Sequence, residues 1–222
     1  MEVNSRINSI LAISEEKVWI GTENGLFLAE NNTLKRIRQF DSLNITSLCA
    51  DNQNRVWLVA ENELYTGQKT FNGNSLFEKS KLLNQLEIES ENQIKCLFQD
   101  KKGNTWLGFS NSAPFVFNGI NLVKVTDQFS ELNINCVAED HRGNIWLGTE
   151  YSGIIILRKE NEKWKIVKEL NPETGFWLSK VNSILFLNEN TCLLGSNRGI
   201  NKINLDSDEN IISQKKSDLL RV

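Results

Sequence analysis

The chain repeats one pattern five times, and this self-similarity limits its fold more than any other feature. The stretch Asp140 to Ile154 reads DHRGNIWLGTEYSGI, and much of it recurs at Asp100 to Gly108 as DKKGNTWLG. A period of roughly 40 to 50 residues is typical of solenoids, propellers and arrays. In each copy an opening Ile or Val lies twelve positions before a tryptophan, or before a leucine in the fifth copy: Ile7 and Trp19, Ile45 and Trp57, Ile94 and Trp106, Ile134 and Trp146, Val181 and Leu193.

Each copy contains short apolar runs separated by polar turns. In the first copy these runs predict four short strands, within Ile10–Ile13, Val18–Gly21, Leu26–Ala29 and Leu34–Phe40. Four antiparallel strands per repeat are typical of a β-propeller blade, whereas a parallel β-helix has shorter coils and no tryptophan at a fixed hairpin position. We therefore predict an all-β fold, a β-propeller of five four-stranded antiparallel blades that forms either a closed five-bladed ring or an arc of a larger propeller. The whole chain, 1–222, is then a single domain, with blades at about 7–40, 45–92, 94–126, 134–169 and 181–216.

The motif D-x-x-G-N-x-W-x-G predicts a tight turn between the first two strands of a blade. Its aspartates, Asp100 and Asp140, can accept hydrogen bonds from turn amides, and its glycines, Gly103 and Gly143, permit a positive φ. The asparagine after each glycine tolerates the left-handed region. Because such turns lie one blade apart and do not converge, we interpret these acids as structural and not as catalytic or metal-binding groups.

The tryptophans at the fixed position of the second strand are predicted to pack neighbouring blades together. One large ring in each of the first four copies suits this role, whereas stacking on a ligand is the less favoured alternative. These rings are Trp19, Trp57, Trp106 and Trp146.

The charge balance and the cysteines exclude several classes of function. The chain has 25 Lys+Arg against 28 Asp+Glu, a net charge of -3, so we expect no nucleic-acid partner. No apolar run is long enough to cross a bilayer, and the start MEVNSRINSI lacks the regions of a signal peptide, so we expect no membrane insertion of this segment. Cys96 and Cys136 occupy a position that is serine in the other copies, and we interpret the four cysteines as small buried residues without disulfides. With one histidine and no C-x-x-C, we expect no metal and no cofactor.

The repeat resembles a known family. The series WIGTENGL at Trp19 to Leu26, DHRGNIWLGT at Asp140 to Thr149, and the Leu-Asn pair before an opening Ile, as at Leu132-Asn133, look like the two-component regulator propeller repeat. This resemblance covers Ile7 to about Ile203. It implies the periplasmic, ligand-sensing portion of a hybrid histidine kinase, with further propeller blades or a kinase in a longer parent chain. The sequence departs from the family pattern in having only five copies, Val59 in place of a glycine, and Leu193 in place of a tryptophan.

The turn motif is also similar to the Asp-box of sialidases and related glycoside hydrolases. That box usually has a serine two places before its aspartate, where Phe98 stands here. Sialidases also need an arginine cluster and a tyrosine nucleophile, and neither Tyr65 nor Tyr151 has an arginine pattern around it. We therefore expect no enzyme activity.

A ligand is most readily accommodated on the face where the strand 2–3 loops and the links between blades open. Aromatic rings beside carboxylates suit an oligosaccharide or a protein ligand. The competing interpretation is that these carboxylates solvate turns and the aromatic rings cover a blade edge. The candidate residues are Glu23, Glu61, Glu150, Tyr151 and Arg198 in the loops, and Phe176 and Trp177 in the link before the fifth copy.

These observations predict a non-catalytic, ligand-sensing β-propeller that the family resemblance makes carbohydrate-responsive. The alternatives are a protein–protein interaction scaffold and, third, a glycan-active enzyme with Asp-box-like turns.

Overall fold

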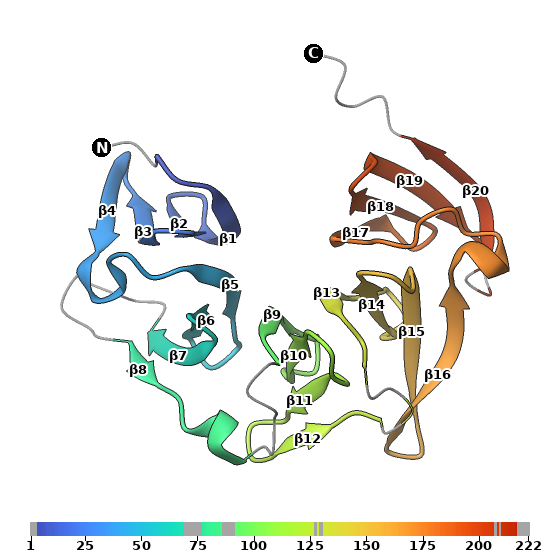
Figure 1. Ribbon diagram of the computed structural model, residues 1–222, viewed down its shortest axis with the longest axis horizontal. Coiled ribbons are helices and arrows are strands. Elements are labelled where there is room, and N and C mark those ends of the chain that lie inside the picture. Colours follow the sequence, from blue (N-terminus) through green and yellow to red (C-terminus); the bar gives the residue numbers. More distant parts are fainter. Residues whose placement is uncertain are drawn as a thin grey trace.

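The computed structural model describes residues 4–68, 77–85, 92–126, 128, 131–206, 208 and 210–216. These residues form five four-stranded antiparallel sheets, and each sheet consists of four strands that are consecutive in the chain (Figure 1). The predicted all-β propeller architecture with five blades is therefore confirmed. The helices in the described part are three 3-10 turns, η1 (Arg38–Phe40), η2 (Leu82–Gln85) and η3 (Pro172–Thr174).

Most strands are five to eight residues long, and each strand of the first blade overlaps one of the apolar runs of the first copy. The strands of the first two blades are β1 (Ile7–Ser14), β2 (Lys17–Thr22), β3 (Gly25–Glu30), β4 (Thr33–Ile37), β5 (Ile45–Ala50), β6 (Arg55–Ala60), β7 (Glu63–Gln68) and β8 (Glu78–Lys79). Those of the third and fourth blades are β9 (Ile94–Gln99), β10 (Thr105–Phe109), β11 (Phe115–Phe117), β12 (Leu122–Lys124), β13 (Ile134–Glu139), β14 (Ile145–Thr149), β15 (Ile154–Glu160) and β16 (Lys163–Leu170). The fifth blade contains β17 (Ser183–Asn188), β18 (Thr191–Ser196), β19 (Gly199–Leu205) and β20 (Ile211–Lys216).

The blades form an open arc. Figure 1 shows the first strand of every blade on the concave side and the fourth strand on the outside, with the first and fifth blades standing apart at the open end. Exposure agrees with this arrangement, because Ile10 on β1 is 63% exposed and Leu185 on β17 is 59% exposed, whereas Leu48 on β5 is 6% exposed. Of the two arrangements that the sequence allows, the structure has the arc.

Each tryptophan of the repeat lies in a core shared by two blades. Trp106 of the third blade is fully buried against Val137, Ile145 and Leu147 of the fourth. Trp146 of the fourth blade packs in the same way against Leu194 of the fifth. Trp19 and Trp57 occupy the corresponding places at the two earlier boundaries. The ring therefore belongs to the boundary between blades more than to its own sheet.

The glycine two positions after the tryptophan lets neighbouring blades approach closely. A Cβ added at Gly108 would lie 2.7 Å from Cγ2 of Ile134, the opening residue of the next blade, and 2.5 Å from Sγ of Cys96. The position of Cys96 must be small for the same reason. In the first two blades its serine equivalents connect adjacent inner strands, because Oγ of Ser9 and Oγ of Ser47 accept hydrogen bonds from backbone amides of the next blade, at 3.0 and 2.9 Å.

The aspartate of the turn motif is a hydrogen-bonding hub. Oδ1 of Asp100 accepts from the backbone amides of Lys102 and Asn104, at 3.0 and 2.8 Å. Its Oδ2 accepts from Nδ2 of Asn104 and from Nε1 of Trp106, at 2.8 and 2.9 Å. One carboxylate thus closes the turn and orients the ring that joins the blades.

The fourth blade repeats this geometry, with Asp140 accepting at 3.1 Å from Nε1 of Trp146. Gly103 and Gly143 have φ of 87° and 83°, as the motif predicts. The expectation for the asparagines is wrong, since Asn104 and Asn144 are not among the positive-φ residues of the described chain. Their side-chain amides bind the aspartates instead.

The second blade contains the same hub, although its sequence obscures the motif. Asp51, 2% exposed, accepts from Nε1 of Trp57 at 2.8 Å and from Nε of Arg55 at 2.5 Å. Asn54 replaces the motif glycine and has φ of 63°. Burial acts to raise the pKa of Asp51, but hydrogen bonds from Trp57 and Arg55 outweigh it and lower the pKa below its ordinary value.

An Asn-Gly pair between two apolar runs, as at Asn118-Gly119, predicts a two-residue hairpin turn, and here the structure differs. The pair Asn118-Gly119 does not form a two-residue turn, because Phe117 pairs with Leu122 and leaves a four-residue loop in which Ile120 is 80% exposed. In this loop Oδ1 of Asn118 accepts from the backbone amide of Asn121 at 2.8 Å. The long excursion of the second copy contains the short strand β8 and the turn η2, and its residues 69–76 and 86–91 lie outside the described part.

Replacement of Trp146 by alanine should lower the free energy of unfolding by about 3 to 5 kcal/mol, because it removes a fully buried ring from the boundary between two blades. The measurement is urea denaturation followed by circular dichroism. Trp177→Ala is the matched control, since that ring is 42% exposed and its loss should cost much less. An unchanged midpoint for Trp146→Ala would contradict the packing role.

Replacement of Asp51 by asparagine should destabilise the protein by about 1 to 3 kcal/mol at neutral pH, because buried donors lose an acceptor. The lowered pKa means that the ionised carboxylate stabilises the fold above the unfolded-state pKa of about 3.9. This contribution is lost as the pH falls through the folded-state pKa. The stability difference between the two proteins, measured by urea denaturation at a series of pH values, should therefore shrink in acid. An undiminished difference would contradict this linkage, and Asp41→Asn, in an exposed pair with Arg36, is the control.

Candidate functional site

Two sets of loops meet on one face of the arc, which we call the rim. In the fourth blade the backbone amide of Glu150, in the strand 2–3 loop, donates to the carbonyl of Asn133 in the link before that blade, at 2.9 Å. The amide of Gly153 in the same loop donates at 2.7 Å to Ser179 in the link to the fifth blade. The corresponding bond in the second blade joins Glu61 to Asn44 at 3.2 Å. Each strand 2–3 loop therefore lies beside the entry of its own blade and, in the fourth, beside the entry of the next.

A register shift near the start of the inner strand recurs in the first four blades. The shift falls one residue after the opening Ile, and such bulges re-aim side chains and are common beside functional sites. Sequence reasoning missed this set, although its signal is visible, since this position varies where the flanking ones repeat. The residues at the shift are Asn8, Thr46, Lys95 and Asn135.

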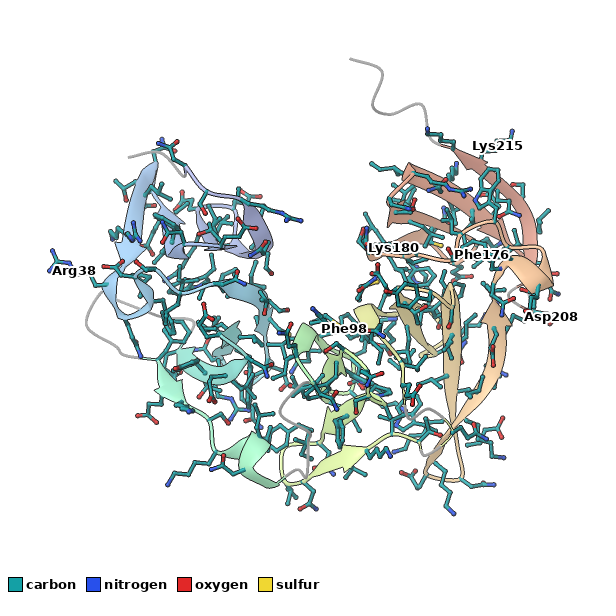
Figure 2. All side chains as sticks on the ribbon, in the orientation of Figure 1. Arg38, Phe98, Phe176, Lys180, Asp208 and Lys215 are labelled. Atoms are coloured by element: carbon teal, nitrogen blue, oxygen red, sulfur yellow. The ribbon has the colours of Figure 1, made fainter. Side chains whose placement is uncertain are left out.

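The best-defined polar cluster of the rim lies at the boundary between the fourth and fifth blades. Oε2 of Glu150 accepts from Nδ2 of Asn135 at 2.9 Å, and Oε1 accepts from Nζ of Lys180 at 2.5 Å. Nδ2 of Asn135 also donates to the carbonyl of Val181 at 3.3 Å. Figure 2 shows Lys180 beside this boundary, toward the concave side of the arc. The cluster thus connects a loop, a bulge and the link between two blades.

The charge of Glu150 is stabilised by its neighbours. Desolvation acts to raise its pKa, but the hydrogen bonds from Lys180 and Asn135, together with the charges of Lys180 and Lys95, lower the pKa below its ordinary value. The carboxylate is therefore ionised at neutral pH and acts as an acceptor. A general acid would instead need a raised pKa.

The other predicted loop residues are spread along the rim and do not converge. Oε1 of Glu61 accepts from the backbone amide of Asn44 at 2.8 Å. Glu23 lies 3.4 Å from Arg6 in an exposed pair. Arg198 is exposed in the β18–β19 turn, where its backbone amide binds Oγ of Ser196. Glu61 and Glu150 thus have defined structural partners.

The three predicted aromatic residues have different environments. Tyr151, next to Glu150, is 73% exposed, and Trp177 is 42% exposed. The expectation that Phe176 is exposed is wrong, because the structure buries it completely with Trp146 and Leu178. Figure 2 labels its position in the interior of the fourth and fifth blades. Phe176 anchors the link and presents no surface to a ligand.

Some polar groups near the second boundary have spare hydrogen-bonding capacity. Oγ1 of Thr46 and Oδ1 of Asn92 are buried, and in the part of the chain that the structure describes neither has a hydrogen-bond partner. Buried polar atoms are usually satisfied by protein or by water. These two atoms are therefore additional acceptors in the region where blades two and three meet.

One pocket lies away from the rim, between the outer strands of the third blade and the β15–β16 hairpin. Its volume is about 610 Å³, and Trp164 contributes its apolar wall together with Val116 and Val123. Trp164 also packs edge-to-face on Trp106, with ring centroids 4.8 Å apart. Because its lining includes core side chains of this boundary and three flexible lysines, we interpret this pocket as a packing groove.

The thiols are not arranged for chemistry. All four cysteines are free, and burial raises the pKa of Cys136 and of Cys192 to about 12. The attacking form of a cysteine is the thiolate, which these environments disfavour. Within the described ranges, no three His, Cys, Asp or Glu side chains are grouped to hold a metal ion.

Comparison with protein families identifies the repeat. The model of the two-component regulator propeller matches residues 89–111 and 128–151, which contain the start of the third and fourth blades and both complete turn motifs. These two segments, about a fifth of the chain, are what matches the two-component regulator propeller repeat. A comparison with curated protein sequences finds no significant match.

Solved structures share the fold of this repeat protein over nearly its whole length. The extracellular domain assigned to a hybrid two-component system of B. thetaiotaomicron is 19% identical, with a TM-score of 0.72 over 96% of this chain and 28% of that one. A domain assigned to a one-component system of the same organism is 16% identical, with a TM-score of 0.70 over 97% of this chain and 28% of that one. An ancestral GH74 enzyme is 14% identical, with a TM-score of 0.62 over 97% of this chain and 33% of that one. This chain thus spans 28% to 33% of the length of these three proteins.

These similarities are to extracellular domains assigned to one- and two-component systems and to an enzyme alike. In the residues that the structure describes, no helix combines the length and the apolar composition needed to cross a membrane.

Proposed function

We propose that this propeller is a non-catalytic binding module of an extracellular or periplasmic sensor and that its rim contacts the ligand at the boundary between the fourth and fifth blades. The observation that carries the proposal is the presence of regulator propeller repeats in an arc that superposes over 96% of its length on the extracellular domain of a hybrid two-component system. We infer the function of this chain from its likeness to that domain.

The chemistry of the rim supports an oligosaccharide as the ligand. Tyr151 presents an exposed ring next to the ionised Glu150, and the amide of Asn135 and the ammonium of Lys180 lie on the same carboxylate. An aromatic face packs against the C–H face of a sugar, while carboxylates and amides bind its hydroxyl groups.

The same geometry argues against glycoside hydrolysis. That reaction usually needs two carboxyl groups flanking one bond, one of them with a raised pKa. On the rim Glu23, Glu61 and Glu150 come from three different blades, and the pKa of Glu150 is lowered. The resemblance to a GH74 enzyme is therefore one of fold.

Binding should be detected when the purified protein is titrated with a panel of defined oligosaccharides by calorimetry. For an oligosaccharide that binds, Tyr151→Ala and Glu150→Gln should each weaken the affinity by about tenfold or more, because they remove a stacking surface and a charged hydrogen-bond acceptor. Glu160→Gln is the matched control, since Glu160 pairs with Lys165 in the β15–β16 hairpin, outside the rim loops.

Two results would contradict the proposal. Full affinity in both rim variants would remove this boundary from consideration, and release of reducing sugar from any member of the panel would make the protein an enzyme. If a protein and no oligosaccharide binds with the same dependence on Tyr151, the rim is an interaction scaffold.

A further inference from the structure

The face of the first blade that lies at the open end of the arc has the residues of a blade interface. Its residues Ile10, Val18 and Ile20 stand at the same repeat positions as Leu48, Val56 and Leu58 of the second blade. In the second blade this set is buried, with exposures of 6%, 0% and 0%. In the first blade Ile10 is 63% exposed, and the other two are partly buried. The set therefore has the composition of a contact surface without its burial.

The internal boundaries of the arc show which residue of the neighbouring blade packs on this three-residue set. At the boundary between blades three and four, Val137, Ile145 and Leu147 pack on Trp106 of the preceding blade. The other three boundaries follow the same rule, with the tryptophan of the earlier blade against the set of the later one. The surface that complements the first blade is thus the tryptophan-position face of another blade.

The fifth blade exposes that kind of face at the other end of the arc. Leu193 occupies the tryptophan position and is half-buried, and Leu185 and Leu187 beside it are 59% and 52% exposed. Lys202 pairs with Leu193 in the sheet and is exposed. Lys202 pairs in turn with Lys215, which Figure 2 places on the last strand at the open end. This face combines leucine side chains with two cations.

The first blade carries a groove of opposite charge where these cations would lie. The groove has a volume of about 370 Å³, and Glu15 and Glu16 line it together with Val18 and Ala29. Glu30 also lines it but forms ion pairs with Lys17 and Lys35, so Glu15 and Glu16 supply the charge. Glu15 and Glu16 are exposed in the β1–β2 turn. The two open faces are therefore complementary in charge as well as apolar.

The sheet register brings Lys202 to this groove. At the boundary between blades three and four, Val116, the strand-3 partner of Trp106, packs in one cluster with Leu157, the partner of Ile145. Lys202 is the counterpart of Val116, because both pair with the tryptophan position. Ala29 is the counterpart of Leu157, because it pairs with Val18. An interface of the internal kind would place Lys202 beside Ala29.

We propose that the fifth blade of one copy of this chain docks on the first blade of a second copy and reproduces the internal blade interface. Leucines at positions 185 and 193 pack on Ile10 and Ile20 of the second copy, and Lys202 meets the acidic groove. The interface is heterologous, since the two copies use different surfaces. Such contacts generate a ring when the rotation closes and a longer chain of copies when it does not.

Sedimentation velocity of the purified chain over a wide concentration range tests this proposal. The unaltered protein should show a mass above that of one chain that rises with concentration. Ile10→Asp and Leu185→Asp should each abolish self-association, because each places a charge in one half of the interface. A mixture of these two variants should form a species of two chains and no larger one, since each variant keeps one intact face. These results separate head-to-tail docking from a symmetric dimer. In a symmetric dimer two first-blade faces would meet, so Leu185→Asp, which keeps that face intact, would still self-associate.

Ile120→Asp is the control, because Ile120 is 80% exposed in the β11–β12 loop of the third blade and should not affect the mass. Lys202→Glu should weaken association, and combining it with Glu16→Lys should restore it at least partly. The proposal is overturned if the unaltered chain is monomeric at every concentration, which would leave the open faces to further blades of a longer protein. It is also overturned if the mixture of Ile10→Asp and Leu185→Asp stays monomeric or if Ile120→Asp has an equal effect.

Discussion

The fold depends on a ring of one blade packing against an apolar set of the next. A four-stranded sheet of about 35 residues cannot bury both of its faces alone, so most of its stability comes from its neighbours. At the boundary formed by Trp106, the aspartate of the same turn binds the indole N–H, and a glycine lets the next inner strand approach. Three residues of one short motif therefore set the turn, the orientation of the ring and the distance between blades. This concentration of roles explains why the motif recurs while the loops around it change.

The scaffold could be predicted because its physical requirements repeat. A tryptophan at a constant distance from an opening Ile and a glycine two places later report the same packing in copy after copy, so the blades and most strand positions follow from spacing alone. Asp51 escaped notice because Arg55 and Asn54 replace the residues that make the motif recognisable, although the carboxylate binds Trp57 in the same way. The hydrogen-bonding geometry of the motif thus occurs even where some of its residues are replaced.

The site was predicted less well because it consists of the positions that do not repeat. Composition alone cannot distinguish Phe176 from Trp177, yet one is fully buried and the other is 42% exposed. Their difference arises from the path of the link, which no local pattern encodes. The contact of Glu150 with Lys180 joins residues 30 positions apart and depends on how the fourth and fifth blades meet. The bulge at Asn135 likewise requires knowledge of strand register.

Every sheet of this molecule is assembled from four strands that follow one another in the chain, and the two ends of the described chain share no sheet. The contacts within each blade are therefore local in sequence, and those between blades join immediate neighbours. Each blade can therefore pack on its predecessor once its own residues have left the ribosome, so we expect folding to be able to follow synthesis blade by blade. For the same reason, duplication or deletion of a whole blade changes the length of the arc without rethreading any strand. Blade number in such chains is consequently open to evolutionary change at little topological cost.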